Sequence, residues 1–137
     1  MPRILWDETF SVHNAELDKQ HQKWIESINE LHEALTSPDL SLLKPIAATS
    51  LEAMMQYVRY HFSSEEEYML AINYPDLAGH KMIHEKFYVQ VKGLLCDVKE
   101  GRTVLNSEIM KTMTNWLQNH ILQEDMKYSR FAAALDR

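Results

Sequence analysis

Histidine is the residue type that sets this sequence apart. Seven of its 137 residues are histidine, about twice the share of an ordinary composition. The pairs His61 with Glu65 and His80 with His84 place potential ligands four residues apart. On a helix such side chains leave the same face about 5 to 6 Å apart at Cβ, so both members can reach one metal ion. Either pair alone is a weak indication, because a histidine and a glutamate at this spacing more often form a surface ion pair.

The apolar residues around the histidines follow the period of a helix. In the first segment Leu17, His21, Trp24 and Ile28 recur at alternating spacings of four and three, which is typical of a bundle helix. Turn residues at 36–39, at 73–76 and around Gly101 interrupt the pattern. We therefore expect one domain over 1–137, with an irregular N-terminal arm (1–14), helices at about 15–36, 41–71, 76–99 and 104–127, and a C-terminal extension to 135. Short connections predict an all-α fold, an antiparallel up-down-up-down four-helix bundle.

This bundle would bring most of the histidines to one level. Five histidines fall on the apolar seams together with Glu65, whereas His13 lies in the arm and His32 lies one position off its stripe. Their places at the starts and ends of alternating helices put them at the same end of the bundle. Buried polar groups are costly without a partner, and a metal ion is a partner that all of them can share. The predicted ligands are His21, His61, Glu65, His80, His84 and His120.

The ligand types narrow the choice of metal. Imidazole and carboxylate ligands without thiolates suit iron, manganese, zinc or copper, and five histidines exceed the needs of one tetrahedral zinc ion. Two metal ions bridged by carboxylates are the natural number. Periodicity favours Glu124, four residues after His120, as a further carboxylate over Asp125. Glu66 and Glu67 are expected to be solvated. The sequence lacks the pattern of a ferritin-like di-iron site, because no glutamate has a histidine three residues later.

Charge and composition exclude other classes. The 14 Lys and Arg against 20 Asp and Glu give a net charge of −6, which argues against nucleic acid and anionic membranes as partners. The single Cys96 cannot form an internal disulfide. No segment reaches the roughly 18 apolar residues of a membrane span, and the N-terminus lacks a signal-peptide pattern. We expect a soluble, cytoplasmic protein.

Over about residues 6–128 the sequence resembles the hemerythrin family, and closely its bacterial single-domain members, the bacteriohemerythrins. The matching segments are WDETFSV at 6–12, LDKQH at 17–21, HFSSEE at 61–66, YP at 74–75 followed by the pair His80 and His84, and the pair His120 and Asp125, five residues apart.

The resemblance implies a ligand set and a cofactor. It implies that His80, His84 and His120 saturate one iron ion, that a second iron ion with an open position is held by His21 and His61, and that Glu65 and Asp125 bridge the two. Asp125 thereby replaces Glu124, the choice made on periodicity. The implied cofactor is a pair of iron ions with an oxo or hydroxo bridge, alternating between Fe(II) and Fe(III), with dioxygen as the ligand.

The resemblance also implies a function. We expect reversible dioxygen binding by a carrier, store or delivery protein rather than an enzyme, with an oxygen-consuming or redox protein as a candidate partner. The alternatives are an oxygen sensor, a di-iron oxidase or scavenger, and a structural metal-bound helical interaction module. Apolar side chains near the open iron should exclude water, although each also fits an ordinary bundle core. The expected oxygen pocket comprises Trp24, Ile25, Phe62, Trp116, Leu117, Ile121 and Tyr128.

Overall fold

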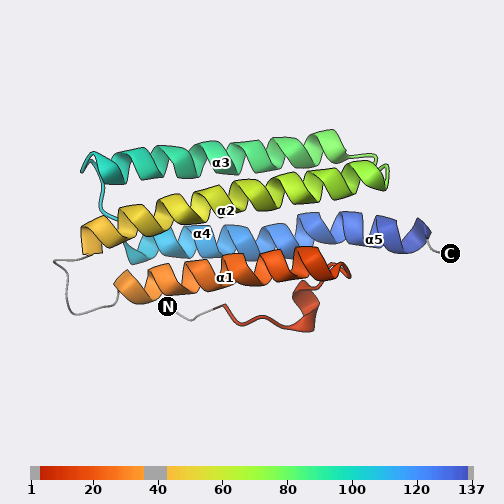
Figure 1. The fold of residues 1–137 in the computed structure, drawn as a ribbon, viewed down its shortest axis with the longest axis horizontal. Helices are drawn as coiled ribbons and strands as arrows, with labels where there is room; N and C mark the ends of the chain where they lie inside the picture. The colour runs from red at the N-terminus through yellow and green to blue at the C-terminus, as the bar shows by residue number, and fades with distance from the viewer. Residues whose placement is uncertain (1–3, 36–42, 136–137) are drawn as a thin grey trace.

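The described residues form an antiparallel bundle of four long helical rods (Figure 1). A computed structural model describes residues 4–35 and 43–135 of the chain. The fourth rod is composite, because a π-helical turn, η3, joins α4 to α5. The elements are η1 (Glu8–Phe10), α1 (Ala15–Leu35), α2 (Leu43–Ala71), α3 (Leu77–Lys99), α4 (Ser107–Asn119), η3 (His120–Asp125) and α5 (Met126–Leu135).

Side-chain caps and turn residues fix where the helices begin and end. The Asn14 side chain accepts a hydrogen bond from the Leu17 amide (3.1 Å), and α1 follows directly. The Asn106 side chain accepts one from the Ile109 amide (3.0 Å). Because of this cap α4 begins at Ser107, later than the expected 104. Gly101, which follows α3, has a φ of 73°, a left-handed conformation that glycine adopts without steric cost.

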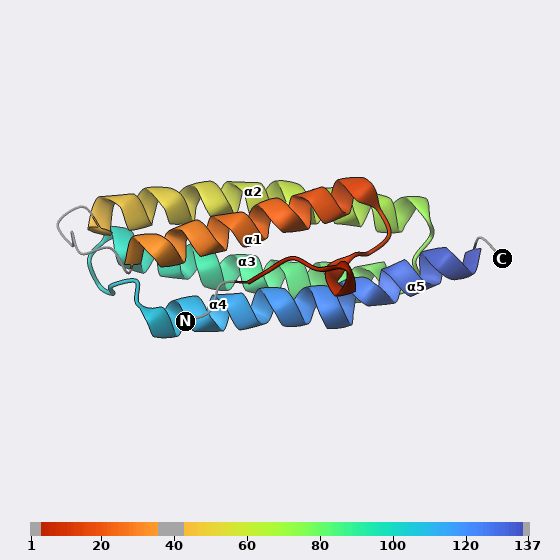
Figure 2. The ribbon, with the colours of Figure 1, turned by 90° about the horizontal axis from the view of Figure 1, so that it is seen from below.

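The predicted fold class is confirmed. Helix α2 packs against α1 and α3, and α4 packs against α1, while the two views show the rods running side by side (Figures 1 and 2). The predicted break at 36–39 and the predicted helix start at 41 lie outside the described residues. Within the part of the chain that is described, no helix is long and apolar enough to cross a membrane.

The core consists of two apolar clusters with a polar layer between them. The larger cluster includes Trp24 and Leu117, and the smaller one consists of Val12, Leu17, Met69 and Tyr128. On α1, Leu17 precedes His21 by one turn and Trp24 follows it by one turn. The histidine therefore lies at the level where one cluster gives way to the other.

The N-terminal arm is fastened along the bundle. Figure 2 shows it running between α1 and α4. The Asn29 side chain bonds both the amide (3.1 Å) and the carbonyl (3.0 Å) of Ile4. Further along, the Val12 amide donates to Asp18 Oδ1 (2.8 Å), and Ser129 Oγ donates to the Val12 carbonyl (2.9 Å). These bonds hold Val12 in the smaller cluster, next to the polar layer.

Candidate metal centre

The polar layer contains five histidines and two carboxylates, each 3% exposed or less. Their ligand atoms form two overlapping groups, and within each group the atoms lie within 4.8 Å of one another. Glu65 and Asp125 belong to both groups. The three-histidine group adds His80, His84 and His120, and the two-histidine group adds His21 and His61.

The oxygens of the two carboxylates lie close to the imidazole nitrogens of the layer. Asp125 Oδ1 lies 3.1 Å from Nε2 of both His80 and His120, and Asp125 Oδ2 lies 3.1 Å from His21 Nε2. Glu65 Oε1 lies 3.1 Å from His61 Nε2 and 3.4 Å from His84 Nε2. Each carboxylate therefore faces both groups, as a bridging ligand must.

The π-helical turn brings Asp125 into the layer. In η3 the Met126 amide donates to the Ile121 carbonyl, five residues earlier, so that residues five apart come to the same face. Asp125 is thus fully buried near His120. Glu124 has a side chain that is 27% exposed and pairs with Lys127 at 3.2 Å. The choice of Glu124 from an α-helical period was wrong for this reason.

The unsatisfied atoms of the layer test whether a metal ion fits. Eight buried side-chain atoms of the seven layer residues lack a hydrogen-bond partner: both ring nitrogens of His21, His61 Nε2, His80 Nε2, His120 Nδ1, Glu65 Oε1, Asp125 Oδ1 and Asp125 Oδ2. A buried polar atom left in this state costs about 1 to 3 kcal/mol. His84 Nε2 also faces His120 Nε2 at 3.1 Å, a contact between two basic nitrogens that a cation would relieve. Nitrogen and carboxylate donors of this kind fit iron.

The electrostatics of the layer favour a cation. Burial by itself lowers the pKa of His21, but Asp125 and Glu65 outweigh it and raise that pKa to about 10. Burial alone would likewise raise the pKa of Glu65, yet His61, His21 and His84 hold it well below its usual range. At neutral pH the metal-free centre therefore contains an ionised carboxylate and a protonated imidazole. A binding metal ion would displace that proton.

Three neighbouring side chains hold the layer from outside. The His61 ring donates from Nδ1 to Gln20 Oε1 (2.8 Å), and the His84 ring donates from Nδ1 to Glu66 Oε2 (3.0 Å). The Tyr128 hydroxyl donates to Glu65 Oε2 (2.6 Å). Sequence reasoning missed Gln20, and it placed Glu66 in solvent, which is wrong because Glu66 is half-buried against His84.

The residues expected around an oxygen pocket lie on both sides of the polar layer. Phe62 lies flat on His84, with ring centroids 3.7 Å apart, and Trp116, which is only half-buried, stacks on His120 at 4.5 Å. Both rings thus contact the three-histidine group. Tyr128 belongs to the smaller cluster, on the other side of the layer. The remaining expected residues, buried in the larger cluster, are Trp24, Ile25, Leu117 and Ile121.

The other two histidines belong to neither group. His13 is exposed in the arm. His32 is buried, but it lies 11 residues after His21 on α1, about 16 Å along the helix. The division of the histidines drawn from the sequence therefore matches their positions.

Comparisons with known proteins agree with this geometry. Residues 12–132 match the family model described as the hemerythrin HHE cation binding domain. The chain is 34% identical to the myohemerythrin of Theromyzon tessulatum, over 90% of this chain and 88% of that protein. It is 30% identical to a bacteriohemerythrin of Stenotrophomonas maltophilia, over 94% and 81%. A crystal structure of wild-type hemerythrin superposes with a TM-score of 0.86 at 27% identity, covering 94% of this chain and 97% of that one.

Proposed function

Because this chain belongs to the hemerythrin family, we propose that it holds two iron ions in the polar layer and binds dioxygen reversibly, as a carrier, store or delivery protein. One observation carries the proposal. Two groups of buried ligand atoms overlap in Glu65 and Asp125, which is the arrangement that a pair of bridged metal ions requires.

The proposed assignment follows the two groups. His80, His84 and His120 would hold one iron ion, His21 and His61 the other, and Glu65 and Asp125 both. The unequal numbers of histidines leave a free position on the second ion. Iron supplies the reversible binding of dioxygen by changing between Fe(II) and Fe(III).

The surrounding side chains would keep water away from that position. Trp24, Leu117 and Ile121 have no exposed surface, and an apolar environment disfavours the release of a charged product. The buried Nε1 of Trp24 lacks a hydrogen-bond partner, and the Trp24 ring lies 5.8 Å from that of His61. The Trp24 ring therefore lies beside the two-histidine group.

We propose a binding protein rather than an enzyme. A carrier returns its dioxygen unchanged, whereas an oxidase or scavenger consumes a reductant with every turnover. The partner proposed is dioxygen, with delivery to an oxygen-consuming or redox protein. The exposed free thiol of Cys96 suits a reducing compartment such as the cytoplasm.

Metal analysis tests the proposal first. Protein produced with ample iron should contain two iron ions per chain, and in air it should consume no added reductant beyond the amount that first reduces the iron. One metal ion per chain, or zinc in place of iron, would contradict the two-iron centre. Continuous consumption of reductant and dioxygen would favour an oxidase.

A further inference from the structure

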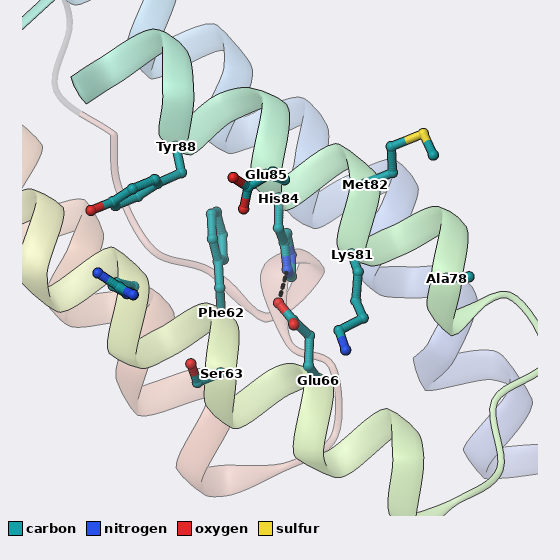
Figure 3. A pocket seen from close by; sticks show the side chains of 10 residues that line it. Phe62, Ser63, Glu66, Ala78, Lys81, Met82, His84, Glu85 and Tyr88 are labelled. Carbon is teal, nitrogen blue, oxygen red and sulfur yellow. Dashed lines mark hydrogen bonds and ion pairs between the residues drawn. The ribbon is translucent and has the colours of Figure 1, made fainter. Parts of the chain in front are cut away.

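A surface cleft of about 540 Å³ between α2 and α3 reaches one histidine of the metal centre. Figure 3 shows Phe62 and Glu66, from α2, meeting His84, from α3, within this cleft. The His84 side chain is 3% exposed and that of Glu66 is 23% exposed. Glu66 therefore connects a buried ligand to the solvent-accessible side of the bundle.

The His84 ring is held from several directions. Phe62 lies parallel to it, with an interplanar angle of 4°. Glu66 Oε2 lies 3.0 Å from Nδ1 at one edge, and the opposite edge directs Nε2 to Glu65 Oε1 and His120 Nε2. Because a carboxylate only accepts hydrogen bonds, Nδ1 carries the proton of this pair. The lone pair of Nε2 is thereby left for a metal ion.

The two groups differ in the charge of the residue that accepts a hydrogen bond from a histidine Nδ1. His61, in the two-histidine group, donates to the neutral amide oxygen of Gln20 at 2.8 Å. His84, in the three-histidine group, donates to a carboxylate. A hydrogen bond to an ionised acceptor is roughly twice as strong as one between neutral groups. A carboxylate at Nδ1 also makes the imidazole a more basic ligand.

From these contacts we propose that Glu66 is a positioning residue for the metal centre. It orients His84 and strengthens Nε2 as a ligand, and its negative charge stabilises the more highly charged state of the three-histidine ion. Gln20 orients His61 without adding charge. The two metal positions consequently differ in affinity and in reduction potential, beyond the difference in their number of histidines. This inference rests on the proposed two-iron function.

Two neighbouring glutamates offer a matched test. Glu66→Gln removes a negative charge beside His84 while keeping an oxygen that can accept its Nδ1–H. Glu67→Gln removes the same charge one residue away, where the side chain is exposed. Glu66→Ala removes both the charge and the hydrogen bond. Circular dichroism of each metal-free variant would establish that the bundle is folded before metal is added.

The readouts are Fe(II) titration of the metal-free proteins without air, against a competing chelator, and the midpoint potential of the loaded proteins. Glu66→Gln should weaken one of the two iron sites by about 10- to 100-fold and leave the other unchanged. It should also raise the midpoint potential, since Fe(III) loses a stabilising charge. Glu66→Ala should weaken the same site at least as much, and Glu67→Gln should match the parent in both measurements.

The outcomes separate this inference from the proposed function. If the parent binds two iron ions and the Glu66 variants bind them as tightly as Glu67→Gln, at the same potential, Glu66 has no positioning role. Equal weakening of both iron sites would contradict the assignment to His84. If the parent itself fails to bind two iron ions, the proposed function is wrong and this inference fails with it.

Discussion

Replacing Tyr128 by phenylalanine removes one hydroxyl group from the metal centre and leaves the ring in place. The hydroxyl donates to Glu65 Oε2 at 2.6 Å, and both residues have no exposed surface. Burial and the neighbouring Glu65 raise the pKa of Tyr128 well above its usual value, so the hydroxyl is a neutral donor. A hydrogen bond to a charged acceptor contributes about 1.5 to 3 kcal/mol. Tyr128→Phe creates no large cavity, so the cost should be close to that figure.

The measurement is unfolding of the metal-free protein by urea and by heat, followed by circular dichroism. A loss of about 1.5 to 3 kcal/mol corresponds to a fall in Tm of about 3 to 12 °C for a domain of this size. Tyr60→Phe is the control, because Tyr60 is 55% exposed and surface substitutions usually change stability by less than about 0.5 kcal/mol. If Tyr128→Phe unfolds within about 0.5 kcal/mol of the parent, the hydroxyl does not stabilise Glu65 and the reasoning from this contact is refuted.

Three further substitutions test the centre. His84→Ala should lower both the iron content and the thermal stability, since metal binding stabilises the fold. His32→Ala should keep its full iron content. Equal iron losses in the two variants would contradict the division of the histidines into ligands and non-ligands. Asp125→Asn should lower the iron content and Glu124→Gln should not. The reverse result would contradict the inference that the π-helical turn brings Asp125, and not Glu124, to the metal centre. Leu117→Ala should retain iron but shorten the lifetime of the oxygenated protein in air, because solvent enters the site. The lifetime is measured by visible absorption, and an unchanged value would show that Leu117 only packs in the core.

The helical period was sufficient to predict the bundle and the polar layer. His21, His61 and His84 repeat in phase with apolar neighbours, and short connections force the helices to alternate in direction. A buried layer of imidazoles then requires a common partner. The fold and the histidines of the centre are thus accessible from the sequence, because both depend on spacing along regular helices.

Departures from the regular helix could not be predicted from the helical period. A π-helical turn adds one residue to a turn, so it exchanges Glu124 for Asp125 without any signal in an α-helical period. Only the resemblance to a family pointed to Asp125. The sequence also carries no signal for which atoms of neighbouring helices meet. The hydrogen bond between Glu66 and His84 could therefore be identified only from the packing of α2 on α3. In the run of three glutamates, only Glu65 is in phase with the seam.

The most direct test of reversible dioxygen binding is a gas cycle on the protein loaded with Fe(II). Visible absorption and dioxygen uptake would be recorded as the sample is exposed to air, freed of dioxygen and exposed again. A centre in which Glu65 and Asp125 join two iron ions should take up one dioxygen molecule per chain, develop an absorption band, and lose both on deoxygenation over repeated cycles. Absorption that persists after dioxygen is removed, or uptake that continues at the expense of a reductant, would contradict reversible binding at this centre.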